Sequence, residues 1–80
     1  MRREVKTFAH AMEYKLGLND HKGGWENLDN EELFYRLREE VDELQEAIKE
    51  GNYINILLEA ADVANYALMI AWNAMKGELK

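Results

Sequence analysis

A long apolar segment, residues 54–72, most constrains what this chain can fold into. It predicts a helix with apolar side chains on every side, and such a helix must be buried all round. The segment also contains the carboxylates of Glu59 and Asp62, and an unpaired buried charge is costly. Few basic residues follow, since the nearest downstream one is Lys76. The sequence therefore predicts a buried helix whose carboxylates are compensated by a bound cation.

The length of the chain limits how that helix can be covered. The 80 residues predict a single domain, residues 1–80, and a chain this short is marginally stable alone. It has no cysteine, so neither a disulfide nor a thiolate metal site can stabilise it. Two short partner helices cannot cover an all-round apolar helix. We therefore expect an all-α, three-helix chain that forms a helical bundle through homo-oligomerisation, with the third helix at the subunit interface.

The N-terminal part predicts one helix and one long loop. Residues 3–16 carry apolar side chains at helical spacing, and Gly17 is the predicted end of that helix. Residues 17–28 are rich in Asn, Asp and Gly and predict a loop. The loop is long for so small a domain, which favours a functional role. Its most distinctive stretch is His21-Lys22-Gly23-Gly24-Trp25.

A second helix is predicted to begin after Asp29, which forms a capping box with Glu32. Gly51 and Asn52 separate it from the third helix, which is predicted to run to about Met75 before a polar, frayed tail. The second helix carries one predicted apolar stripe for a helical partner, with Glu40 and Glu43 at its edge: Leu33, Phe34, Leu37, Val41, Leu44 and Ile48.

Two carboxylate motifs lie on the second and third predicted helices. Glu39, Glu40 and Glu43 read E-E-x-x-E, and Glu59 and Asp62 read E-x-x-D. Residues three apart share a helix face, so a hairpin could bring the pairs Glu40/Glu43 and Glu59/Asp62 together. Four facing carboxylates suit a hard divalent cation. On the second helix, an ordinary solvated acidic face is the competing interpretation.

Three other residues allow both a structural and a functional interpretation. Asn65 continues the face of the second carboxylate pair, and it either makes an interface contact, orients a metal ligand or holds a substrate oxygen. Trp25 either plugs one end of the bundle or stacks on a base. Lys22 is either solvated or neutralises a phosphate, beside glycines whose backbone N–H groups can approach an anion.

Charge and patterning exclude several classes of protein. The net charge of −6 argues against binding a nucleic acid polymer through its phosphates. The N-terminus lacks the apolar run of a signal peptide. The apolar segment is interrupted by Glu59, Asp62 and Asn65 and falls short of the ~20 residues that a membrane span needs. We therefore expect no membrane span and a cytoplasmic location.

The two carboxylate motifs together resemble those of the all-α nucleoside triphosphate pyrophosphohydrolases, the MazG-like superfamily. The matching residues are Glu39-Glu40-Val41-Asp42-Glu43 and Glu59-Ala60-Ala61-Asp62. Residues 8–13 and 21–25 resemble the small members that are grouped with dATP/dGTP pyrophosphohydrolases. The resemblance covers nearly the whole chain. It implies hydrolysis of a nucleoside triphosphate to the monophosphate and pyrophosphate, with purine deoxynucleotides favoured, by a homo-oligomer that is a dimer or a tetramer.

The resemblance also implies roles for individual residues. Mg²⁺, with Mn²⁺ as a possible substitute, would be held by Glu40, Glu43, Glu59 and Asp62. Glu39 would be a further ligand or would position the attacking water. The chain ends soon after the third helix, without the C-terminal extension of larger relatives, so phosphate contacts are expected from Lys22, Arg36, Arg38, Lys76 or another subunit.

Three alternatives stay open at this point. The substrate could be dCTP, dUTP or phosphoribosyl-ATP, which other members of the superfamily hydrolyse. The protein could be a non-catalytic helical assembly whose carboxylates bind a structural metal or pair with basic residues across an interface. A nucleotide-sensing regulator without hydrolysis lies between these.

Overall fold

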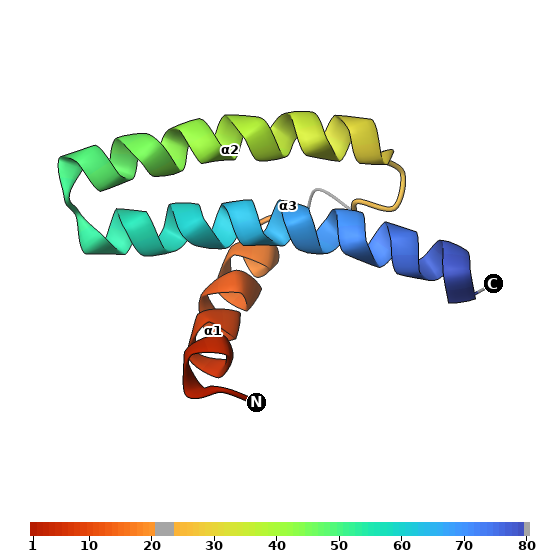
Figure 1. The fold of residues 1–80 in the computed structure, drawn as a ribbon, viewed down its shortest axis with the longest axis horizontal. Helices are drawn as coiled ribbons and strands as arrows, with labels where there is room; N and C mark the ends of the chain where they lie inside the picture. The colour runs from red at the N-terminus through yellow and green to blue at the C-terminus, as the bar shows by residue number, and fades with distance from the viewer. Residues whose placement is uncertain (21–23, 80) are drawn as a thin grey trace.

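Three α-helices make up the fold in a computed structural model that describes residues 1–20 and 24–79. They are α1 (Arg3–Leu18), α2 (Asn30–Glu50) and α3 (Tyr53–Leu79), and the described ranges contain no strand. Figure 1 shows α2 and α3 as an antiparallel hairpin, with α1 crossing α3 and its N-terminus pointing away from the hairpin. The predicted three-helix, all-α class is confirmed, and the homo-oligomer stays a prediction.

Short polar signals set the ends of the hairpin helices. The Asp29 side chain accepts a hydrogen bond from the backbone N–H of Glu32 at 2.8 Å, so the predicted N-cap of α2 is confirmed. Gly51 ends α2 with a φ of 76°, a left-handed conformation that glycine adopts without strain. Asn52 then caps α3, because its side chain accepts the backbone N–H of Asn55 at 3.1 Å. The predicted break between the two helices is therefore confirmed.

Two helix ends differ from the prediction. α1 continues through Gly17 to Leu18, because a glycine that keeps a helical backbone costs only about 1 kcal/mol relative to alanine. α3 continues past Met75 to Leu79. Lys, Glu and Leu in residues 76–79 are good helix formers, so the predicted frayed tail was wrong there.

The single apolar stripe predicted for α2 is two lines in the structure. Leu33 is buried, and Leu37 and Leu44 are half-buried. Glu40 lies between Leu37 and Leu44 on this inward line, whereas the prediction placed it at the edge. The remaining three residues of the predicted stripe are about half exposed, and they repeat every seventh position: Phe34, Val41 and Ile48. The three-and-four spacing fits both lines, and packing against α3 selects the one that contains Glu40.

The third helix is not buried all round within one chain, so that prediction was wrong for the monomer. Six large apolar side chains of α3 are exposed: Tyr53, Ile54, Leu57, Leu68, Trp72 and Met75. The accessible surface of 6332 Å² also exceeds the roughly 5000 Å² expected for a monomeric protein of this mass. A second copy of the chain could cover this surface, which keeps the homo-oligomer prediction open.

Length and composition alone would also let part of α3 cross a membrane. Residues 53–77 meet those criteria, with a mean hydropathy of 1.4. A mostly buried core helix of a soluble protein meets the same criteria, whereas 11% of the apolar window of α3 is buried within one chain. The expectation of no membrane span therefore stays a prediction.

Candidate metal centre and adjoining pocket

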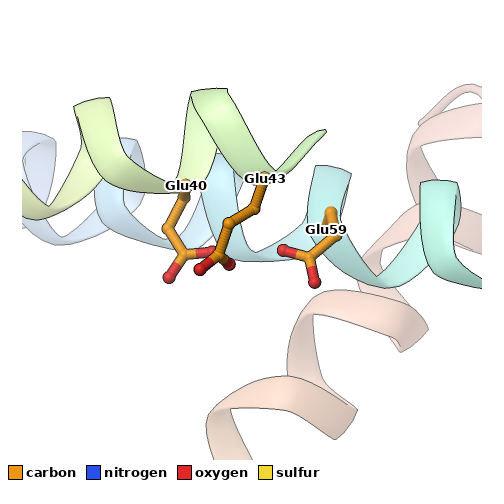
Figure 2. Close-up of side chains that lie close together, drawn as sticks. All are labelled: Glu40, Glu43 and Glu59. Carbon is orange, nitrogen blue, oxygen red and sulfur yellow. The ribbon is translucent and has the colours of Figure 1, made fainter. Parts of the chain in front are cut away.

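Three carboxylates from the two hairpin helices meet near the middle of the molecule. Glu40 and Glu43 lie one turn apart on α2, and Glu59 lies on α3. Figure 2 shows the α2 carboxylates pointing the same way, with that of Glu59 beside them. One oxygen from each residue lies within 4.8 Å of those of the other two. The structure thus brings together three of the four predicted metal ligands, which we call the carboxylate triad.

The environment of the triad disfavours its negative charge. Burial raises the pKa of Glu40 to about 8, assisted by the interaction with Glu43 and by the negative charges of Asp62, Glu43 and Glu59. Burial is also the main cause of the raised pKa of Glu59, followed by Glu43. A cation at this position would remove the repulsion and favour the ionised form of each carboxylate.

Two oxygens of the triad lack a hydrogen-bond partner. Glu40 Oε2 and Glu59 Oε2 are both buried and unpaired. A buried carboxylate oxygen is normally satisfied by a hydrogen bond, a basic side chain or a metal ion. Oxygen ligands alone suit Mg²⁺ or Mn²⁺. The donor set and the unpaired oxygens therefore fit the predicted cation.

The fourth predicted ligand is held differently. Asp62 forms an ion pair with Lys15 of α1, with Lys15 Nζ 3.3 Å from Asp62 Oδ2 and both side chains 20% exposed. Asp62 still lies near the triad, because its charge raises the pKa of Glu40. The expectation that few basic residues would be available to these carboxylates considered only downstream positions such as Lys76, and it missed Lys15.

Lys15 is a candidate functional residue that the sequence interpretation missed. It lies between Met12 and Leu16, two members of the apolar stripe of α1, so its position on the edge of that stripe was visible in the sequence. What was not visible is that α1 crosses α3 beside Asp62, because no local pattern reports that crossing.

Replacing Lys15 by Met should destabilise the metal-free protein by roughly 1–3 kcal/mol, because Asp62 would keep a largely buried charge without a partner. Mg²⁺ should recover part of this loss. Urea unfolding with and without Mg²⁺ measures both effects. Lys6→Met, on an exposed position of the same helix, is the matched control. Equal destabilisation by the two substitutions would contradict a role for the ion pair.

A pocket of about 620 Å³ adjoins the triad, and residues of all three helices and of the loop before α2 line it. Its volume is within the usual range for small-molecule sites. The residues that line it are Lys15, Leu16, Asn19, Asp20, Gly24, Trp25, Asn27, Leu28, Arg36, Glu40, Asp62, Asn65, Tyr66 and Met69. The pocket thus shares Glu40 with the triad, and its lining also includes the apolar side chains of Leu28 and Met69.

Three of the six predicted substrate contacts line this pocket: Trp25, Arg36 and Asn65. Lys22 lies outside the described residues. Lys76 does not line the pocket, and it follows Met69, which does, by seven residues, or about 10 Å along the helix. Contact between Lys76 and the same substrate stays a prediction.

A second, smaller hollow of about 230 Å³ lies on the other side of Arg36 and Glu40, which line both spaces. Glu39, which was predicted to be a further ligand or to position the attacking water, lines this hollow together with Glu43. Glu39 is exposed and is not part of the triad. The Nε of Arg36 donates to Glu32 Oε1 at 3.1 Å in an exposed ion pair between residues one helical turn apart.

Comparisons with known proteins give little further information. No family model matches the chain, and no solved structure matches it. An uncharacterized protein from Archaeoglobus fulgidus is 39% identical over 46 residues, which are 58% of this chain and 50% of that protein. The chain therefore spans half the length of the relative that it matches.

Proposed function

We propose that this chain is a Mg²⁺-dependent nucleoside triphosphate pyrophosphohydrolase of the MazG-like type, which releases the nucleoside monophosphate and pyrophosphate. The observation that carries the proposal is the triad, with its two buried, unpaired carboxylate oxygens, at the end of a pocket large enough for a nucleotide. In this proposal, the cation held by the triad lies beside the phosphates of the bound nucleotide.

Each residue of the site has a proposed role. Glu40, Glu43 and Glu59 would hold Mg²⁺ or Mn²⁺, and Asp62 would join them on leaving its ion pair with Lys15. When bound, the metal supplies positive charge that stabilises the phosphates and lowers the pKa of a coordinated water. No nucleophilic cysteine is present, which suits direct attack by water.

The remaining steps belong to side chains of the chain itself. The oxygen of water forms a bond to the α-phosphorus, and the bond to the bridging oxygen of pyrophosphate breaks. Glu39, beside Glu40 in the smaller hollow, would orient this water and accept its proton. Arg36, which faces both spaces, would bind the charge that develops on the phosphates. Lys15 of α1, once released from its ion pair with Asp62, would also bind the negative charge of the phosphates.

Further parts of the proposal concern substrate and assembly. The preferred substrates would be purine deoxynucleoside triphosphates, with control of nucleotide pools in the cytoplasm as the role. The chain would act as a dimer or tetramer, in which the exposed apolar side chains of α2 and α3 are covered. A partner subunit could then also supply basic residues for the phosphates.

The deciding experiment incubates the purified protein with each canonical dNTP, NTP and phosphoribosyl-ATP in Mg²⁺ and separates the products by chromatography. We expect monophosphate and pyrophosphate in equal amounts, with product formation lost on chelation. Release of orthophosphate would contradict the proposed position of attack. Absence of any product, with Mn²⁺ also tried, would contradict the proposed activity.

A non-catalytic assembly with a structural metal is the second candidate. The observation that favours it is the exposed apolar line of α2 at every seventh residue, formed by Phe34, Val41 and Ile48, because such a line suits a helical partner. This candidate predicts that Mg²⁺ raises the melting temperature while nucleotides leave it unchanged. Under the pyrophosphohydrolase proposal, both raise it.

A further inference from the structure

Besides Glu40 Oε2 of the triad, two buried polar atoms of the pocket residues lack a partner, and they are of opposite type. Asn65 is only 3% exposed, and its Oδ1, a hydrogen-bond acceptor, is unpaired. The indole Nε1 of Trp25, a donor, is also buried and unpaired. Both residues line the pocket of about 620 Å³. Buried polar groups are nearly always satisfied, so these two indicate a ligand that provides the partners.

The orientation of the Asn65 amide is set by the protein. Its Nδ2 donates to the backbone carbonyl oxygen of Met12 at 3.0 Å. Rotating the amide by half a turn would put two oxygens against each other, so the carbonyl of Met12 keeps Oδ1 on the opposite side. The site therefore offers an acceptor at Asn65 and a donor at Trp25, and a ligand must match that polarity.

The position of this pair indicates which end of a ligand it contacts. Asn65 follows Glu59 by six residues, which is about 9 Å along α3. The apolar side chains Leu16, Leu28 and Met69 line the same pocket. A flat, weakly hydrated group suits these walls better than a phosphate or a sugar does. We therefore place the apolar, flat part of the ligand, rather than its phosphates, beside Asn65.

We propose that Asn65 and Trp25 recognise the hydrogen-bonding edge of a nucleobase. An N–H of the base donates to Asn65 Oδ1, and a ring nitrogen or carbonyl oxygen of the base accepts from Trp25 Nε1. The identification of the ligand as a nucleotide rests on the proposed function. The polarity of the pair adds that the base must present an N–H donor, such as the 6-amino group of adenine, beside an acceptor.

The test measures binding rather than hydrolysis, so it is independent of turnover. Trp72 is exposed on α3 and does not line the pocket, and Trp72→Phe leaves Trp25 as the fluorophore. This protein is titrated with dAMP and with the monophosphate of purine 2′-deoxyriboside, which lacks the 6-amino donor. We expect the second nucleotide to bind about ten-fold more weakly or worse, because the acceptor of Asn65 stays unpaired. The monophosphate of 2′,3′-dideoxyadenosine should bind like dAMP.

A substitution completes the test from the side of the protein. Asn65→Leu has a similar size and no acceptor, and it should bind the two purine nucleotides with equal affinity, provided that circular dichroism shows an intact helical fold. The comparison of ligands with Asn65 present does not depend on that variant folding. Three results with Asn65 present would each overturn the proposal. They are equal affinities for dAMP and the purine 2′-deoxyriboside monophosphate, weaker binding of the dideoxy nucleotide alone, and no binding of any of the three nucleotides. Hydrolysis of nucleotides with and without the 6-amino group at equal rates would also overturn this proposal, but it would support the proposed function.

Discussion

Glu40→Gln is expected to lower metal-dependent turnover by at least about 100-fold while the helical fold stays intact. Glu40 belongs to the triad and lines both hollows, so it is the residue that joins the cation site to the proposed substrate pocket. Loss of a metal ligand removes several kcal/mol of charge stabilisation in the transition state, and each 1.36 kcal/mol corresponds to about ten-fold in rate. Steady-state rates of pyrophosphate release at saturating Mg²⁺ measure the effect.

Glu46→Gln is the matched control for this variant. It makes the same change of charge on an exposed residue of α2 that lines neither hollow. Its rate should stay within about two-fold of that of the unmodified chain, because the substitution lies on the surface, away from the triad and both hollows. Retained turnover in Glu40→Gln would show that Glu40 is not needed at the site. An equal loss of turnover in both variants would indicate a general effect of charge.

The helical architecture was largely predictable, because its determinants are local. Asp29 caps α2 through a hydrogen bond three residues away, and Gly51 ends α2 through a backbone conformation that suits glycine. The E-E-x-x-E and E-x-x-D spacing also predicted correctly that Glu40, Glu43 and Glu59 would meet, since a short turn forces consecutive helices into a hairpin.

The parts of the site that involve α1 were not predictable in the same way. α1 lies across α3, and this crossing brings Lys15 to Asp62 and the carbonyl of Met12 to Asn65. These contacts join positions about fifty residues apart, and no sequence periodicity reports them. The apolar pattern of α2 failed for a related reason, because it fits two lines of residues and only the packing against α3 chooses between them.

The raised pKa of Glu40 also links the stability of the metal-free protein to pH. The pKa is about 8 in the folded protein and near the ordinary value of 4.5 in the unfolded chain, so the folded state binds the proton more tightly. The stabilisation by that proton is complete below about pH 4.5 and is lost as the pH rises through 8. Removing the carboxylate should therefore stabilise the metal-free protein at pH 8 and have little effect at pH 4.5.

We expect the melting temperature of metal-free Glu40→Gln to equal that of the unmodified chain near pH 4.5 and to exceed it increasingly up to pH 8. Because Glu40 is only partly buried, solvent reduces the gain to on the order of 1 kcal/mol. In a domain of this size that is about 4–8 °C. Saturating Mg²⁺ should reverse the order at pH 8, since it stabilises only the form with the full triad. Thermal unfolding of both proteins at fixed protein concentration measures these melting temperatures at pH 4.5, at pH 8 and at pH 8 with Mg²⁺. A difference that is constant with pH would contradict the raised pKa of Glu40. A gain from Mg²⁺ that is equal in both proteins would show that Glu40 is not a ligand of the cation.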